Sequence, residues 1–410
     1  GDIYFGEHGG HYCTGCERFY TEKELENGLC PQHLTKPDFI QEKNYFFRMS
    51  KYLPWLAGHI RENPDFIRPE RYRNEVLSMI ESGALEDLCI SRPKSRLTWG
   101  IELPFDKDYV CYVWFDALLN YISALGWPDG DKYAAYWPGE HLVAKDILKP
   151  HGVFWPTMLK SAGVPLYKHL NVHGYWLIKD TKMSKSLGNG INPQDMIRKY
   201  GADSLRFTLA AFAAMGRDIR MSEERIEGYR HFVNKVWNAS RFALMNLPEH
   251  GEPKAVDLGA VKGLHHKWIL NRLEEIKVEE DAALESYRFN DAAQCVYKFL
   301  WNEFCGWYLE LIKADMKEEG EAKEEAQYVL YTVLREILLL LHPMIPFVTA
   351  EVWNSLPGHE GTDIATQLYP ETRPQCVKKR ESDEMIFLQE AISAIRTIRA
   401  ELNIKPSYRL

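Results

Sequence analysis

The chain has 410 residues, with 50 basic against 58 acidic side chains, a formal net charge of −8 and 45% hydrophobic residues. This composition excludes a disordered chain, a fibrous protein and a small disulfide-stapled domain, and the length suffices for two to four domains. No run of about 18 apolar residues occurs, so we expect no contact with a membrane. The chain begins at Gly1 without an initiator Met or a signal peptide, and the missing Met leads us to expect a reading frame that begins further upstream. The eight cysteines do not resemble a disulfide framework, so we expect a cytoplasmic protein.

Helix and strand signals alternate in the first half. We predict helices over 44–85, 117–125 and 146–162, and buried strands over 110–115, 141–144 and 170–176. Such alternation predicts a parallel α/β sheet. From about Ser222 onwards apolar residues recur at helical spacing and strand signals nearly vanish, which predicts an all-α bundle.

The charge is unevenly distributed. Residues 160–241 carry seven lysines and seven arginines against seven acidic residues, so a basic middle lies inside an acidic protein. This excess is typical of a phosphate or nucleic-acid footprint, and a solvated basic surface is the equal alternative.

Four potential metal ligands lie in two closely spaced pairs, Cys13-x2-Cys16 and Cys30-x2-His33. Two thiolates and a thiolate–imidazole pair at these spacings suit a tetrahedral zinc ion. Four protein ligands leave no open position, so we predict a structural role for the zinc.

A polar segment with two lysines occupies 182–189, Lys-Met-Ser-Lys-Ser-Leu-Gly-Asn. Its lysines could bring point charges onto phosphates and stabilise a departing pyrophosphate. On physical grounds alone, an ordinary basic surface turn is the better explanation of the segment.

This segment resembles the lysine signature loop of class I aminoacyl-tRNA synthetases. Further segments resemble methionyl-tRNA synthetases: 87–92, 99–101, 113–122, 145–147, 154–156 and 173–176. The resemblance runs almost continuously over residues 1–225, and the zinc ligands fit it.

The resemblance implies the second half of a Rossmann-type catalytic fold with a zinc-knuckle insertion, followed by an α-helical anticodon-binding bundle. The implied divisions are 1–90 for the zinc-knuckle insertion, 91–175 for the catalytic half-fold, 176–225 for the lysine loop and stem contacts, and 226–410 for the bundle.

The resemblance also implies roles for single residues. Lys185, assisted by Lys182, would be catalytic. ATP, with Mg²⁺, would contact Asp146, His173, Gly174, Lys182, Ser184, Lys185 and Ser186. The methionine side chain would lie among Trp114, Ala117, Tyr121, Ile147, His151 and Trp155. Aromatic rings pack well on a thioether.

Two features depart from the family pattern. Pro150 precedes His151 where an aromatic residue is expected, and the His-x-Gly-His signature is missing. The stretch 8–11, His-Gly-Gly-His, has similar letters, but no strand precedes it and no helix follows it. We therefore expect the first half-site upstream of Gly1 or on another polypeptide, and this chain alone to be inactive.

The helical half resembles valyl rather than methionyl enzymes, in segments 232–242, 301–310, 342–347 and 398–404. Asn238, Arg241 and Trp307 are the candidates for reading anticodon bases, by hydrogen bonds and stacking. Core packing is an even alternative for Trp307.

The sequence therefore favours a methionine–tRNA ligase that uses ATP, methionine and the methionine tRNA. A valine or isoleucine enzyme is the first alternative. The absence of room for an editing insertion between Gly1 and Trp114 argues against it. The second alternative is a non-catalytic, zinc-containing tRNA-binding fragment or a subunit of a split enzyme.

Overall fold

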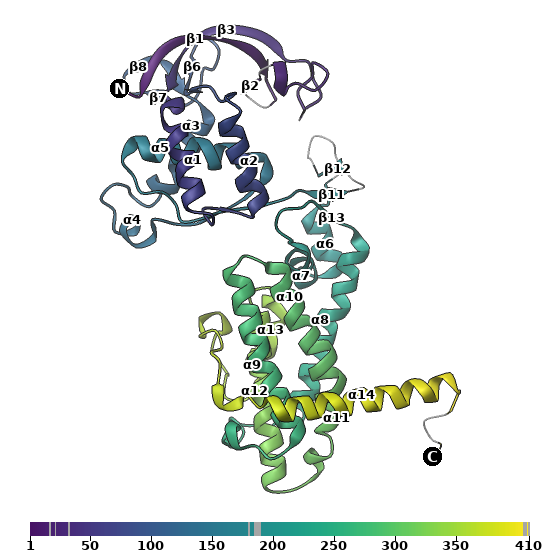
Figure 1. The fold of residues 1–410 in the computed structure, drawn as a ribbon. Coiled ribbons are helices and arrows are strands. Elements are labelled where there is room, and N and C mark those ends of the chain that lie inside the picture. Colours follow the sequence, from purple (N-terminus) through teal and green to yellow (C-terminus); the bar gives the residue numbers. More distant parts are fainter. Residues whose placement is uncertain are drawn as a thin grey trace. The chain divides into compact units, whose positions relative to one another are not determined.

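Two structural units make up the chain, Gly1–Gly174 and Tyr175–Leu410. The computed structural model describes residues 1–15, 18–20, 22–31, 33–178, 181–183, 190–404 and 408 (Figure 1). Within this described part, no helix is both long and apolar enough to cross a membrane.

The first unit mixes strands and helices. Its strands are β1 (Ile3–Cys13), β2 (Arg18–Tyr20), β3 (Asp38–Phe47), β4 (Ile67–Arg68), β5 (Leu88–Cys89), β6 (Ser91–Pro93), β7 (Glu102–Leu103), β8 (Asp106–Cys111), β9 (His141–Ala144) and β10 (Leu170–His173). Its helices are α1 (Leu53–Glu62), α2 (Glu70–Glu81), α3 (Val113–Ser123), α4 (Asp131–Tyr136) and α5 (Trp155–Ala162).

A short parallel sheet, in the order β4-β10-β9, lies at the centre of this unit. The central strand β10 is buried on both faces, at Leu170, Asn171 and Val172, and Ile67 of β4 and Val143 of β9 are also buried, whereas Leu142 on the edge strand β9 is exposed. Burial on both faces is typical of parallel strands covered by helices, and it confirms the α/β prediction. β4 lies inside the segment predicted as the zinc-knuckle insertion, so part of 1–90 belongs to the parallel sheet.

A long antiparallel pair, β1 with β3, forms the edge of the unit seen in purple in Figure 1. Its register runs from Ile3 opposite Phe47 to Tyr12 opposite Asp38. The His-Gly-Gly-His stretch 8–11 lies within β1, and its residues are paired with β3. A paired strand offers no helix N-terminus to a phosphate, which agrees with its interpretation as a chance match.

Two sequence predictions in this unit were wrong in part. The helix predicted from 44 begins only at Leu53, because 44–47 complete β3, where Phe46 lies opposite Tyr4 and Cys89. The strand predicted over 110–115 ends at Cys111, and helix α3 follows from Val113. A short apolar and aromatic run does not by itself distinguish a strand from a helix.

The predicted strand over 170–176 is also divided. β10 ends at His173 in the first unit, and Trp176 begins β11 in the second. The predicted helix over 146–162 is a 3-10 turn (Lys145–Ile147), a π-helical turn (Pro150–Phe154) and α5. Pro156 has no N–H for a backbone hydrogen bond, which accounts for the irregular turn before it.

The second unit is mainly helical. Its strands are β11 (Trp176–Ile178), β12 (Thr181–Lys182) and β13 (Ile219–Arg220). Its helices are α6 (Pro193–Tyr200), α7 (Ala202–Phe212), α8 (Glu223–Leu244), α9 (Leu264–Glu285), α10 (Phe289–Lys298), α11 (Leu309–Leu311), α12 (Glu321–Leu341), α13 (Pro346–Asn354) and α14 (Lys379–Glu401), with a π-helical segment over Phe299–Tyr308.

A small apolar cluster, Met196, Tyr200, Leu205, Met221 and Ile226, packs around α6. One large apolar core holds the helices of the bundle together. Its largest fully buried side chains include Phe207, Phe232, Trp268, Phe299, Phe304, Tyr308 and Trp353. The predicted helical bundle is confirmed, and α8 begins directly after Ser222, where the helical pattern was recognised. The structural unit that contains the bundle begins earlier, at Tyr175. The helices α6 and α7, which precede Ser222, were missed by the sequence pattern.

Glu280 on α9 is fully buried in this helical core, and burial raises the pKa of its carboxyl to about 8. The folded protein therefore keeps a proton that the unfolded chain releases above its ordinary pKa of 4.5. The free energy of unfolding consequently falls as the pH rises from about 4.5 to 8.

We expect Glu280→Gln to remove this pH dependence. At pH 8 the variant should unfold with a free energy up to about 4 kcal/mol above that of the wild type, and near pH 4.5 the two should differ little. Scanning calorimetry at both pH values measures the difference. The exposed neighbour Glu279→Gln is the control. An equal increase in the free energy of unfolding at both pH values would contradict the raised pKa of Glu280.

Candidate active site and metal-binding group

Aromatic side chains from three elements of the first unit meet in one cluster. Trp114 and Tyr121 come from α3, His151 from the π-helical turn, and Trp155 from the start of α5. The ring centroids of His151 lie 6.1 Å from Trp114 and 5.7 Å from Tyr121, and those of Tyr121 and Trp155 are 6.2 Å apart. The structure therefore brings together most of the residues predicted to hold the amino-acid side chain.

Hydrogen bonds fix the protonation of this cluster. His151 Nδ1 lies 2.9 Å from the carbonyl oxygen of Ile147, which can only accept, so Nδ1 carries the proton. His151 Nε2 then accepts the hydrogen bond from the Tyr121 hydroxyl at 2.9 Å. Burial lowers the pKa of His151, which keeps the imidazole neutral. The cluster is thus an uncharged wall whose polar atoms are satisfied.

His141, the first residue of β9, also belongs to this cluster and was not predicted. Its Nε2 accepts a hydrogen bond of 3.2 Å from the Trp155 indole, and its ring centroid lies 4.3 Å from that of Tyr121. Burial, together with the neighbouring His151, lowers the pKa of His141 to about 4. In the sequence, His141 is recognisable only as a histidine at the start of a predicted buried strand, and it was interpreted as part of that strand.

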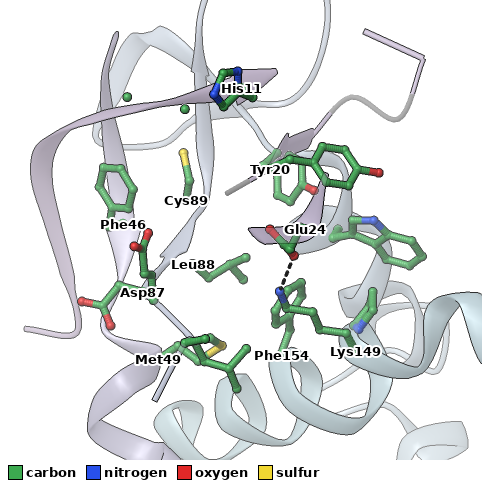
Figure 2. A pocket seen from close by; sticks show the side chains of 18 of the residues that line it. His11, Tyr20, Glu24, Phe46, Met49, Asp87, Leu88, Cys89, Lys149 and Phe154 are labelled. Atoms are coloured by element: carbon green, nitrogen blue, oxygen red, sulfur yellow. Dashed lines mark ion pairs between the residues drawn. The ribbon is translucent and has the colours of Figure 1, made fainter. Parts of the chain in front are cut away.

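A cavity of about 690 Å³ adjoins this wall, between the β1–β3 strand pair and the segment 146–154 (Figure 2). Of the predicted site residues, its lining includes Trp114, Asp146 and Ile147, whereas Ala117, Tyr121, His151 and Trp155 do not line it. In Figure 2, Lys149 reaches from this segment toward Glu24, and their charged atoms lie 3.7 Å apart.

The charges around this cavity are mainly negative. Its acidic lining residues are Glu22, Glu24, Glu86, Asp87 and Asp146, and its basic ones are Arg92 and Lys149, with His11 beside them. A wall with this charge favours an ammonium group over a phosphate. The cavity therefore suits a small molecule with an amino group and an apolar side chain.

The remaining predicted site residues are distributed as follows. Ala117 lies on α3 between Trp114 and Tyr121, half-buried. His173 ends β10, and its Nδ1 donates to the Gly174 carbonyl at 2.8 Å. The predicted ATP ligands Ser184, Lys185 and Ser186 lie outside the described residues. Lys182 is described only in its backbone, which pairs with Leu177.

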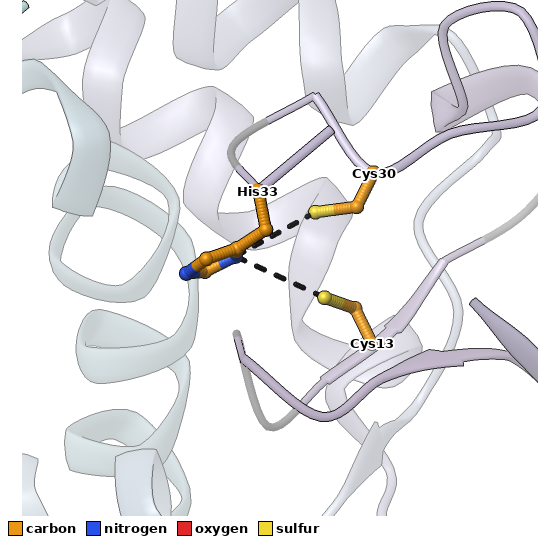
Figure 3. Close-up of side chains that lie close together, drawn as sticks. All are labelled: Cys13, Cys30 and His33. Atoms are coloured by element: carbon orange, nitrogen blue, oxygen red, sulfur yellow. Dashed lines mark hydrogen bonds between the residues drawn. The ribbon is translucent and has the colours of Figure 1, made fainter. Parts of the chain in front are cut away.

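Three of the four predicted metal ligands converge at the end of β1 (Figure 3). His33 Nδ1 lies 3.8 Å from Cys13 Sγ and 3.9 Å from Cys30 Sγ. Both cysteines are buried, and Cys16 lies outside the described residues. These separations suit donors on a single tetrahedral ion with bonds of about 2.0–2.3 Å.

The backbone around these ligands is arranged to let them meet. Leu34 N–H donates to the Cys30 carbonyl at 2.8 Å and so closes a tight turn that holds Cys30 and His33 on one side. A Cβ at Gly15 would lie 2.9 Å from the His33 ring, so only glycine allows this close approach. Three of the four side chains predicted from the cysteine and histidine spacing thus lie together in a group that could hold a metal ion.

The anticodon candidates lie in the second unit. Asn238 and Arg241 are exposed on α8, and Asn238 lines a cavity of about 190 Å³ together with Cys305. Trp307 is half-buried against the helical core, and the Arg396 guanidinium lies 5.1 Å from its ring centroid. Trp307 and Arg241 do not line this cavity, so the structure does not unite the three candidates there.

An α/β unit with a short parallel sheet, an aromatic cluster, a Cys/Cys/His group that could hold a metal ion, and a helical bundle together resemble the features of a class I aminoacyl-tRNA synthetase. The family described as tRNA synthetases class I (M) matches residues 4–239, and that described as the anticodon-binding domain of tRNA ligase matches 266–410. Because the first match covers more than half of the chain, the chain belongs to the class I tRNA synthetases.

Its similar relatives include two valine–tRNA ligases. That of Nitratidesulfovibrio vulgaris is 58% identical, with the match covering 93% of this chain and 46% of the relative. That of Geobacter sulfurreducens is 39% identical, covering 97% and 50%. The chain therefore spans about half the length of the curated relatives it matches.

A similar solved structure is Mycobacterium tuberculosis methionyl-tRNA synthetase in complex with methionyl-adenylate. It is 31% identical, with a TM-score of 0.74, and the match covers 86% of this chain and 71% of that one. The predicted fold class, a synthetase catalytic half-fold followed by a helical anticodon-binding domain, is thus confirmed.

The prediction of methionine specificity is not confirmed, since the sequence relatives favour the valine alternative. The argument against valine relied on the short distance between Gly1 and Trp114. Because the chain spans only half of its relatives, that distance does not bear on an editing insertion, and the argument fails.

Proposed function

We propose that this chain belongs to an enzyme that activates an amino acid with ATP and transfers it to tRNA, and that the amino acid is valine. The observation that carries the choice of valine is the 58% identity to a valine–tRNA ligase over 93% of the chain. The tRNA is then the valine tRNA, read by the helical unit, which resembles valyl enzymes in its sequence.

The neutral aromatic wall supports activation of an apolar amino acid. Tyr121, His151 and Trp155 offer no net charge to a side chain, and their polar atoms already bond one another. The acidic lining of the adjoining cavity would attract the ammonium group of the amino acid.

Methionine is the second candidate, for a specific reason. The aromatic rings of Trp114, Tyr121 and Trp155 are suited to contact a polarizable thioether. A solved structure similar to this chain contains methionyl-adenylate.

ATP–pyrophosphate exchange on the complete reading frame, with Val, Met, Ile and Leu supplied separately, tests the proposal. Exchange with valine and charging of the valine tRNA support it. Exchange with methionine alone overturns the choice of valine. The resemblance to valyl enzymes would then concern only how the helical unit recognises tRNA. No exchange with any of the four, from a folded protein, favours the non-catalytic tRNA-binding alternative.

The Tyr121–His151 hydrogen bond gives a sharper test of the pocket. We expect Tyr121→Phe to raise the KM for the amino acid about tenfold, because it leaves the buried His151 Nε2 without its donor. The KM for ATP should stay unchanged. The exposed Tyr136→Phe is the matched control. An equal rise in both KM values would place Tyr121 outside the amino-acid pocket.

We further propose that Cys13, Cys30 and His33 hold a structural zinc ion, with Cys16 as the fourth ligand. The two thiolates and the imidazole suit zinc, which would tie the end of β1 to the 30–33 turn.

A further inference from the structure

A second group of metal-ligating side chains lies in the helical unit, apart from the site described above. His265 and His266 occupy the first turn of α9, and Asp315 lies in the turn Asp315–Lys317, which follows α11. One ligand atom from each of the three lies within 4.8 Å of the others. We propose that these residues bind a divalent transition-metal ion of the zinc type.

The distances among the three side chains suit this role. Asp315 Oδ2 lies 2.6 Å from His265 Nε2 and 3.5 Å from His266 Nε2. Two ligand atoms on one tetrahedral zinc ion lie about 3.3 Å apart, given bonds of about 2.0 Å. The His266–Asp315 separation already has this value. The His265–Asp315 pair would open by somewhat less than about 1 Å to admit the ion.

The surroundings of His266 resemble those of a metal ligand. Its Nδ1 lies 3.0 Å from the hydroxyl of Tyr308, a fully buried residue. Metal-binding histidines commonly bond a fixed partner through the second ring nitrogen, which orients the ring. His266 is itself buried, and with Nδ1 directed at Tyr308 its Nε2 is the ring nitrogen that faces Asp315.

Gly263, which precedes the first turn of α9, leaves room for the two adjacent histidine rings to lie side by side. Their ring centroids are only 4.0 Å apart. A Cβ at Gly263 would lie 2.8 Å from the His266 ring and 3.0 Å from the His265 ring. The two rings therefore occupy the space that any other residue would fill with its side chain.

Charge and access also favour a cation. The Glu325 carboxylate accepts hydrogen bonds from the backbone N–H groups of Lys262 and Gly263 and adds negative charge beside the group. Lys262, Lys267 and Lys313, which are close to these ligands in sequence, pair with other carboxylates, and Lys317 of the same turn as Asp315 is exposed to solvent. The side chains of His265 and Asp315 are 20% and 25% exposed, so an ion and a completing water can enter from solvent.

Such an ion would tie the start of α9 to the turn that precedes α12. This function concerns the stability of the helical unit and does not depend on which amino acid the enzyme activates.

The test compares metal binding by the wild-type chain with that of His265→Gln and Asp315→Asn. Zinc content at fixed free Zn²⁺ is measured, and Co²⁺ serves as the spectroscopic probe. The Cys/His group of the first unit gives a thiolate charge-transfer band, whereas two imidazoles and a carboxylate do not. Each variant should lose one zinc per chain, or at least about tenfold in affinity, and keep the thiolate band.

The exposed His231→Gln on α8 is the control and should bind as the wild type does. If both variants keep the wild-type zinc content and Co²⁺ spectrum, the three residues form only a hydrogen-bonded cluster and the proposal is overturned. Should either variant fail to fold, hydrogen exchange of the wild type decides. Zn²⁺ should then slow exchange in 264–268 and 313–318, and unchanged exchange there overturns the proposal.

Discussion

Replacing Lys277 by methionine is expected to lower the free energy of unfolding of the helical unit by about 3–5 kcal/mol. Lys277 lies on α9, and its side chain is 1% exposed. Its Nζ lies 2.7 Å from Glu274, 3.1 Å from Glu336 and 2.8 Å from the Glu371 carbonyl oxygen. The methionine would fill a similar volume, so the expected loss comes from charge rather than from a void.

The two glutamates explain the size of the effect. Glu274 and Glu336 are buried, and Arg373 is the other cation that contacts both. Without Lys277, two carboxylates share one guanidinium, and a net negative charge remains in the core. Breaking a buried pair from one side leaves such a charge uncompensated, which is far more unfavourable than never forming the pair.

Hydrogen exchange of the α9 amides, measured by mass spectrometry, reports the change for this unit alone. Lys254→Met is the matched control, because the Lys254–Glu324 pair has a similar distance, 2.6 Å, but is 70% and 36% exposed. Exposed pairs contribute at most about 1 kcal/mol. If Lys277→Met and Lys254→Met lowered the free energy of unfolding equally, the burial of the Lys277 ion pairs would not explain the loss.

The sequence predicted the order of elements better than their boundaries. Helical periodicity located the start of α8, because a long repeat of apolar residues has few alternative explanations. The end of β3 was missed because Asn44 to Phe47 are held by distant partners, β1 and β5, and local spacing does not reveal these partners. The helix at Val113 was missed because β-branched and aromatic residues also occur in strands.

The candidate site residues were likewise predictable only in part. The zinc-type ligands were predictable because their spacing within the chain is itself the signal. Family resemblance predicted that Trp114, Tyr121 and His151 lie together, and the structure brings their rings into one cluster. His141 was missed, because its role depends on a hydrogen bond from Trp155 across the fold. The His265–Asp315 contact joins residues 50 positions apart and has no sequence signal.

Loss of the zinc ion that we propose for Cys13, Cys16, Cys30 and His33 is expected to have the largest effect on the first unit. We predict that Cys30→Ser weakens zinc binding more than about 100-fold, because a thiolate ligand is replaced by a hydroxyl. Cys13, Cys30 and Tyr20 form their own small apolar cluster, to which Leu25 adds a half-buried side chain. So small a core cannot hold 13–35 without the metal, and these residues should lose their protection from hydrogen exchange.

Zinc competition with a chelator and the Co²⁺ thiolate band measure this loss separately from any other metal in the chain. Cys111→Ser is the matched control: it lies in the same unit, at the end of β8, and should retain both the band and the protection of 13–35. If Cys30→Ser kept the wild-type band, the ligand assignment would be wrong. If it lost the band while 13–35 stayed protected, the metal would be bound by the fold without stabilising it. β1 runs from Cys13 back along the cavity wall, where Gly9, Gly10 and His11 line it. A loss of order in 13–35 should therefore also raise the KM for the amino acid in the complete enzyme.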